Sequence, residues 1–395
     1  MTSLLRYEAT EYPHFSVRLT VYTGALLKWV GYGSCVGSVN YFVRGESGWG
    51  WLLFLSCSIS LYRIAHWIGG MPLVPSSLMS LFDPRRTSSQ TFFERQVIKV
   101  VNRYAPGIEK QGKQCAEVCA KGIANLEQLG AKELSLTAVD GTVLHAMYVA
   151  PSKHVKHADA SVFSPSQPPM VMIVLNANGE FFEHDGLYNE HSDALRYGQR
   201  GFHVILMNYR GVGKSGLGGW TSRTGLLLDA DAAVQFALYV LKAPEHRIFF
   251  KTRSLGGAVG TEAASFRPKL NVCNARSFST FSAAARGVIG PKFGKYAAWA
   301  VSFLFWDYDS VRNWKLVGGF KWVEYIPQDT MLCPESILYY ALSEDDSIDT
   351  RSLNVLKMRT TVGDTHNRPL YEFEYSERWS FFEKAFKHIQ AIEKK

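Results

Sequence analysis

A repeat of strand, loop and helix begins near residue 170 and limits the folds that the chain can adopt. Val171–Leu175 and His203–Met207 are short and mostly apolar, and a helical pattern at 227–241 precedes a further strand at 247–250. Strands that are apolar along their whole length are buried on both faces, and the helices between them form crossovers. The pattern predicts an α/β fold with a mostly parallel central sheet flanked by helices.

Further strands are predicted on both sides of this core. Residues 133–139 and 142–149 alternate apolar and polar side chains around Asp140-Gly141, which is typical of a β-hairpin. Later strands are predicted at 272–278, 337–341 and 355–358. Together these elements predict one domain over residues 131–395.

A candidate nucleophile lies in the strand–turn–helix segment 247–260. Ser254 occupies the turn between the apolar strand and a helix that opens with small residues. Such an elbow is so tight that the residues two before and two after the serine must be small, and its strain exposes the hydroxyl. Gly256 fits this requirement, whereas Thr252 stands where a glycine is usual.

A serine nucleophile of this kind needs a carboxylate and then a histidine later in the chain. Asp346 follows the strand predicted at 337–341, with Asp345 as the fallback acid, and His366 follows the strand predicted at 355–358. His366 would take the serine proton as general base, and Asp346 would hold the imidazole tautomer.

Two upstream loops extend this pattern. Residues 208–215 read Asn-Tyr-Arg-Gly-Val-Gly-Lys-Ser and resemble the Asp-Tyr-Arg-Gly-x-Gly-x-Ser turn of many α/β hydrolases. Residues 176–180 read Asn-Ala-Asn-Gly-Glu and resemble their His-Gly-Asn-Gly-Glu loop. The resemblance covers about residues 130–395. It implies an esterase that acts through an acyl-enzyme, without metal or organic cofactor, and an oxyanion hole from the backbone N–H groups of Asn178 and Leu255.

The resemblance also implies a helical cap, inserted at about residues 281–335. This stretch is rich in aromatic side chains: Trp299, Phe303, Phe305, Trp306, Trp314, Phe320, Trp322 and Tyr325. Over the serine, such a cap would suit an acyl ester or another apolar substrate. Simple packing of the cap helices accounts for the aromatic residues equally well.

The N-terminal region, residues 1–82, contains two apolar runs at 19–43 and 49–74. Each is long enough to cross the roughly 30 Å of a bilayer core. We predict a hydrophobic helical hairpin that contacts membrane lipid through residues 19–74, with the hydrolase domain on the cytosol-like side. The alternative is a pair of amphipathic or buried helices, because Lys28, Arg63 and His66 interrupt the runs. Residues 83–130 are predicted to be a helical connector.

An apolar hairpin followed by a degenerate hydrolase domain resembles the chlamydial CHLPS family, which is assigned to the α/β-hydrolase class. The resemblance implies a membrane-associated protein, with a host-derived inclusion membrane as its setting. It implies neither a particular substrate nor a protein partner.

Charge and cysteine content exclude other classes. The formal charge is +8, but the basic residues are scattered and no nucleic-acid motif is present, so nucleic acid is not expected as a partner. Among six cysteines, Cys115 and Cys119 lie four residues apart without a second ligand pair nearby. They are predicted to be free thiols, and no metal site is expected.

Two rival readings remain open. Gly213-Lys214-Ser215 resembles the end of a nucleotide-binding P-loop, but Asn208 stands where the motif needs its first glycine. The second rival is a membrane-anchored hydrolase fold that serves as an inactive binding or scaffold module. Thr252, Asn176 and Ala177 are the departures that support this second reading.

Overall fold

The computed structural model describes residues 5–11, 107–152, 163, 167–188, 191–216, 222–303, 306–361, 363 and 365–394. The hairpin predicted at 19–74 and residues 83–106 of the predicted connector lie outside these ranges. Within them, no helix combines the length and the apolar character needed to cross a membrane.

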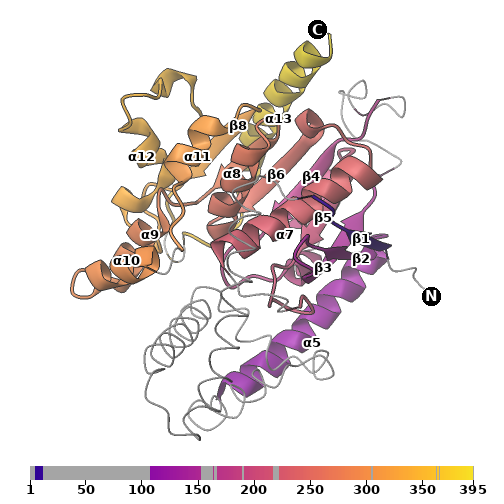
Figure 1. Cartoon of the computed structure of the whole chain (residues 1–395), viewed down its shortest axis with the longest axis horizontal. Coiled ribbons are helices and arrows are strands. Elements are labelled where there is room, and N and C mark those ends of the chain that lie inside the picture. The colour runs from indigo at the N-terminus through magenta and orange to yellow at the C-terminus, as the bar shows by residue number, and fades with distance from the viewer. Residues whose placement is uncertain are drawn as a thin grey trace, which may run out of the picture.

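A central sheet of nine strands forms the core of the described residues (Figure 1). Its order is β1-β2-β3-β5-β4-β6-β7-β8-β9, and β3 runs antiparallel to both neighbours while all other pairs are parallel. Counted from β2, this is the order 1-2-4-3-5-6-7-8 with the second strand reversed, which is the α/β-hydrolase arrangement. The strands are β1 (Leu5–Glu8), β2 (Lys132–Thr137), β3 (Val143–Val149), β4 (Val171–Leu175), β5 (His203–Met207), β6 (Ile248–Arg253), β7 (Asn271–Ala275), β8 (Lys321–Tyr325) and β9 (Asn354–Lys357).

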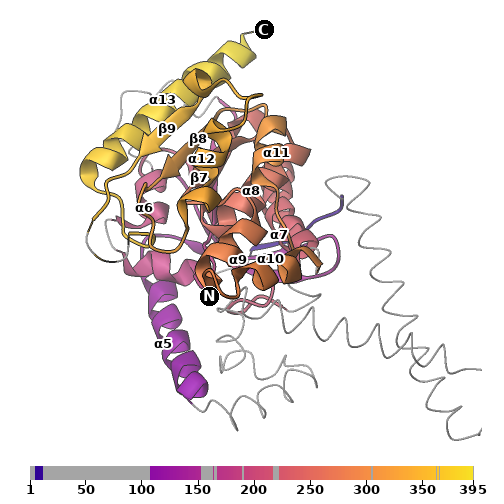
Figure 2. The same cartoon turned by 90° about the vertical axis from the view of Figure 1, so that its left-hand side faces the viewer.

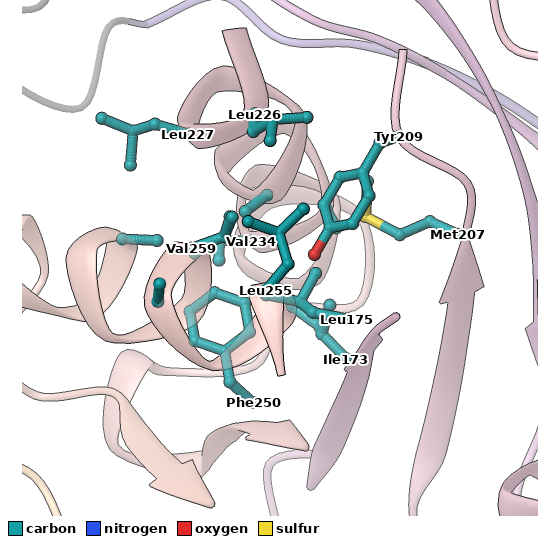
Figure 3. Packing of buried hydrophobic residues seen from close by; sticks show 14 of the residues in the cluster. Ile173, Leu175, Met207, Tyr209, Leu226, Leu227, Val234, Phe250, Leu255 and Val259 are labelled. Carbon is teal, nitrogen blue, oxygen red and sulfur yellow. The ribbon is translucent and has the colours of Figure 1, made fainter. Parts of the chain in front are cut away.

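Helices cover both faces of the sheet (Figure 2). Successive strand residues point to opposite faces, so Ile173 and Leu175 pack in one core cluster with α7 and α8, while Met172 and Val174 pack in another with α6 and α13. Figure 3 shows the first of these clusters. The helices are α5 (Gly107–Gln128), η3 (Phe182–Leu187), α6 (Asp193–Gly198), α7 (Arg223–Gln235), η5 (Phe236–Val240), η6 (Glu245–Arg247), α8 (Leu255–Phe266), α9 (Phe281–Ile289), α10 (Gly294–Phe303), α11 (Ser310–Leu316), η7 (Pro334–Ser336), α12 (Leu338–Ser343), η8 (Thr350–Ser352) and α13 (Glu372–Glu393).

The central elements agree with the sequence prediction. β4 and β5 have the predicted bounds, and β2 and β3 form the predicted hairpin around Asp140-Gly141. The helix predicted at 227–241 is α7, continued by the π-helical turn η5. Apolar runs flanked by clear turn signals account for this agreement.

The prediction of a strand at 337–341 is wrong, because helix α12 begins at Leu338. A short apolar run fits a buried strand or a buried helix equally well, and periodicity cannot distinguish them. The strand next to β7 is instead β8, which carries a buried glutamate. Glu324 accepts a hydrogen bond of 2.6 Å from Arg378 Nε of α13, which compensates its burial.

This correction also changes the predicted cap at 281–335. Strand β8 lies inside that range but belongs to the central sheet. The helical part of the insertion is α9, α10 and α11. Of the aromatic residues assigned to the cap, Trp322 and Tyr325 are therefore sheet residues.

Leu5–Glu8 also belong to the hydrolase sheet, although residues 1–82 were predicted to form a separate region. β1 pairs in parallel with β2 at the sheet edge. Beyond it, Thr10 N donates to Gln235 Oε1 (3.0 Å), and Gln235 Nε2 donates to the carbonyl of Glu11 (2.6 Å). The next described element is α5, and it leads into β2, the strand that pairs with β1.

Candidate functional site

Ser254 occupies a strained turn between β6 and α8. Its backbone has φ 51° and ψ −118°, and its hydroxyl makes no capping hydrogen bond to the helix. A non-glycine residue in such a region typically costs about 1–3 kcal/mol and is retained where function needs the geometry. The turn is held to the sheet by a 2.9 Å hydrogen bond from Ser254 N to the carbonyl of Ala275.

Glycines allow α8 to begin directly against the sheet. A Cβ at Gly256 would lie 2.3 Å from the carbonyl oxygen of Leu175, at the end of β4. A Cβ at Gly257 would lie 2.5 Å from Ser277 Cβ. Gly256 is therefore required by close backbone approach to the end of β4 and the loop that follows it, and Gly257 is required by contact with the Ser277 side chain.

Thr252 is accommodated in place of the usual glycine. Its side chain is fully buried, and its hydroxyl donates to the carbonyl of Cys273 across the sheet at 2.7 Å. Its methyl group faces Gly260 of α8, where an added Cβ would lie 2.7 Å from Thr252 Cγ2. Gly260 on the facing helix thus leaves room for the Thr252 side chain, so the turn does not need a glycine at position 252.

His366 is buried and pairs with Asp329. His366 Nδ1 lies 2.8 Å and 2.9 Å from the two carboxylate oxygens, and the side chains are 4% and 2% exposed. Asp329 Oδ1 also accepts from the backbone N–H groups of Met331 (2.8 Å) and Leu332 (2.9 Å). The carboxylate is therefore fixed on both sides, an arrangement that orients an imidazole and selects its tautomer.

The prediction that Asp346, or Asp345 as the fallback, partners His366 was wrong, because the partner is Asp329. Asp346 is exposed in the turn after α12, and the fallback Asp345 lies 2.6 Å from Lys315 Nζ. Hydrogen bonds from Lys315 and then Ser347 lower the pKa of Asp345 to about 2. The sequence signal for Asp329 was its place four residues after Tyr325, but the misassigned strand concealed it.

Arg276 joins the Ser254 turn to the His366 loop. It directly follows β7 and is next to Ala275, which accepts the hydrogen bond from Ser254 N. Arg276 Nη1 donates to the carbonyls of His366 (2.8 Å) and Arg368 (2.7 Å). Burial, and then the charge of Arg378, lower the pKa of Arg276 to about 10. Ser254 and His366 are thus both tied to residues 275–276.

The loop after β4 lies next to the start of α8, as the predicted oxyanion hole requires. Leu255 is the first residue of α8, so its N–H has no acceptor within the helix. Asn178 is an exposed turn residue. Ala177 N donates to Glu180 Oε2 (3.0 Å), and Glu180 pairs with Arg253, which holds this loop against the elbow. The oxyanion roles of Asn178 and Leu255 remain predictions.

The segment that resembles a P-loop is engaged in structural contacts. Lys214 Nζ lies 2.9 Å from Glu133 Oε1. The Ser215 hydroxyl is buried and donates to the carbonyl of Asn208 at 3.0 Å. These contacts occupy the side chains that a P-loop would direct to phosphate and metal.

Cys115 and Cys119 are free thiols, as predicted, and the structure adds one potential metal ligand that the sequence pattern did not reveal. His184 of η3 approaches the two thiols, and the three ligand atoms lie within 4.8 Å of one another. Hydrogen bonding with Cys119, and then with His184, lowers the pKa of Cys115 to about 5. Helix α5 places the two thiols on one face, and tertiary contact brings His184, which is distant in sequence, to them.

Comparison with known proteins supports the fold. The family model described as serine aminopeptidase, S33, matches residues 169–317, which include Ser254 and end before Asp329 and His366. No curated protein gives a significant match.

Several solved structures are similar to the chain. They include an esterase, Pf2001, from Pyrococcus furiosus (17% identity, 66% of this chain, 93% of that chain, TM-score 0.45). An α/β hydrolase from Vibrio vulnificus gives 16% identity, 65% and 82% coverage and a TM-score of 0.47. Acetyl xylan esterase 1 from Thermoanaerobacterium sp. JW/SL YS485 gives 14%, 68%, 93% and 0.44.

Such distant similarities transfer no substrate and no residue role. The resemblance to the CHLPS family also stays a prediction. The strand order and the family match over residues 169–317 together identify the α/β-hydrolase fold.

Proposed function

We propose that the protein is a serine hydrolase that cleaves carboxylic esters, with Ser254 as nucleophile, His366 as general base and Asp329 as the orienting acid. One observation carries the proposal. Ser254 N donates to the carbonyl of Ala275, and Arg276 donates to the carbonyl of His366, which pairs with Asp329. The strained Ser254 turn and the His366–Asp329 pair are thus anchored to two adjacent residues at the C-terminal end of β7.

The proposed mechanism follows from the roles of these groups. His366 Nε2 takes the proton of Ser254 Oγ as the oxygen attacks the ester carbonyl, while Asp329 holds Nδ1–H and stabilises the imidazolium. The N–H groups of Leu255 and Asn178 would meet the oxyanion. His366 then protonates the leaving alcohol, and water releases the acid from the acyl-enzyme by the same steps.

The substrate class is proposed from the α9–α10 pair. Phe281, Ala284 and Val301 bury one side of this pair in the same core cluster as Leu255. The other side exposes large apolar side chains: Val288, Ile289, Phe293, Tyr296, Trp299 and Phe303. Apolar patches of this kind mark sites for apolar ligands or membranes. They support an acyl ester as substrate and membrane lipid, bound also through residues 19–74, as the setting.

The decisive experiment uses the full chain and its Ser254→Ala variant. Both are treated with a fluorophosphonate probe, and the labelled proteins are then floated with liposomes. We expect covalent labelling of the wild type alone, because only Ser254 is activated, and co-flotation of both proteins with lipid. Circular dichroism establishes that the variant is folded.

A folded wild-type protein that stays unlabelled, with detergent present to loosen the cap, would overturn the hydrolase proposal. The inactive scaffold reading would then be preferred. Labelling without co-flotation would retain the hydrolase and reject the membrane setting, including the inclusion membrane that the CHLPS resemblance implies.

A further inference from the structure

A second cluster of reactive side chains lies between helix α5 and the short helix η3. Cys115 and Cys119 of α5 and His184 of η3 bring two sulfur atoms and one ring nitrogen within 4.8 Å of one another. Thiolate and imidazole are the preferred ligands of zinc in proteins. We propose that Cys115, Cys119 and His184 form a zinc-binding site, which the hydrolase mechanism does not use.

The helix periodicity explains the position of the two thiols. Residues four apart lie on one face of a helix, and Gly122 and Leu126 continue the same stripe toward the hydrolase core. Cys119 is fully buried, whereas Cys115 is half-buried. Both thiols therefore face the body of the domain.

Close backbone contact brings His184 to them. A Cβ at Gly122 would lie 1.9 Å from the carbonyl oxygen of Glu183, and one at Gly186 would lie 2.1 Å from the carbonyl oxygen of Gly122. Asn125 Nδ2 donates to the carbonyl of Gly186 at 2.9 Å and holds the contact. The donors are thus brought together by the packing of α5 and η3, and such preorganisation reduces the cost of binding.

Three protein donors leave the fourth tetrahedral position of zinc for a water molecule or another small ligand. His184 also lines a cavity of about 200 Å³ that reaches Asn176 and Glu180, so the histidine side of the cluster borders open space. Two thiolates balance the charge of Zn²⁺. A simple Cys115–Cys119 disulfide would give the adjacent imidazole no role, so the donor set favours the metal.

Zinc at this position would join α5, by which the chain returns from residues 12–106, to η3, which follows the loop after β4. A metal that binds only the folded state stabilises it by mass action. The inference does not depend on ester hydrolysis, so the site and the activity are tested separately.

The test uses the reduced, chelator-stripped full chain, titrated with Co²⁺ and then with Zn²⁺. We expect one equivalent of cobalt to produce thiolate-to-metal charge-transfer absorption, zinc to displace it, and zinc to raise the unfolding temperature. In Cys115→Ser and His184→Asn, metal affinity should fall by more than about 100-fold, because even outer-shell changes cost 10–100-fold. Cys333→Ser, at a half-buried thiol outside the cluster, should bind as the wild type does.

Cys115→Ser is nearly isosteric at a half-buried position, so it keeps the test informative if His184→Asn fails to fold. Equal cobalt absorption in the wild type and Cys115→Ser would overturn the proposal. A folded, fully reduced wild type that gives no charge-transfer band would overturn it as well. So would mass spectrometry that finds a Cys115–Cys119 disulfide in protein kept under reductant.

Discussion

Two aspartate-bearing loops follow apolar segments in the C-terminal part of the chain, and they differ in what precedes them. Asp329 follows strand β8, has a buried side chain, and binds His366 and two backbone N–H groups. Asp345 and Asp346 follow helix α12, where Asp345 pairs with Lys315 and Asp346 is exposed. Aspartate therefore has a different chemical setting in the two loops, because only the first loop follows a strand that pairs with β7.

The position of the acid therefore depends on sheet pairing more than on sequence spacing. β8 pairs with β7, whose last residue precedes Arg276, and Arg276 binds the His366 loop. The loop after β8 consequently lies beside His366, within reach of Asp329. Helix α12 pairs with no strand, so its aspartates have no comparable route.

The largest expected effect comes from exchanging one carboxylate in each loop for an amide. Asp329→Asn should lower kcat for an ester by about 10⁴-fold, because the amide favours the wrong imidazole tautomer. Asp346→Asn should leave kcat within about twofold, since exposed polar changes are near neutral. Steady-state kinetics on a chromogenic acyl ester measures both. The reverse ranking would restore Asp346 as the acid and remove the comparison.

A smaller effect is expected from Arg276→Met, which removes the two hydrogen bonds that hold the His366 loop. We expect kcat to fall by about 10–100-fold with KM little changed, because displacements of about 1 Å typically cost this much. Arg247→Met is the matched control. Arg247 is also buried, but it directly precedes β6 and binds Glu393 and the carbonyl of Pro168, not the His366 loop.

Both arginine variants should lose stability, by about 1–3 kcal/mol for the polar groups left unpaired. Only Arg276→Met should slow the folded enzyme. Equal kcat values per folded molecule would show that Arg276 supports the fold and does not position His366.

The smallest expected effect concerns the packing around the Ser254 turn, not the identity of the acid. Gly260→Ala should reduce the free energy of unfolding by about 1–3 kcal/mol through overpacking against the Thr252 methyl. Thr252→Ser removes that methyl but keeps a hydroxyl to donate to Cys273. In this background the cost of Gly260→Ala should largely disappear, which urea unfolding of the four proteins measures. Additive costs would contradict the proposed compensation between positions 252 and 260.

Much of the fold and part of the site were predictable because their signals are local. The apolar strands β4 and β5, the Asp140-Gly141 hairpin and the Ser254 turn each depend on residues that are adjacent in sequence. Hydrophobic periodicity and turn chemistry suffice for such elements. His366 was identified as a candidate because it follows a predicted strand near the end of the chain.

The α/β class, the position of the Ser254 turn and the candidate base could all be identified from residue patterns, because each depends on neighbouring residues in the chain. Three further features emerge only from the folded chain: Asp329 pairs with His366, Leu5–Glu8 joins the sheet, and His184 lies beside Cys115 and Cys119. Each of these is a contact between segments distant along the chain. Strand pairing and close helix packing create such contacts, and neither leaves a periodic signal in the sequence around the residues that meet.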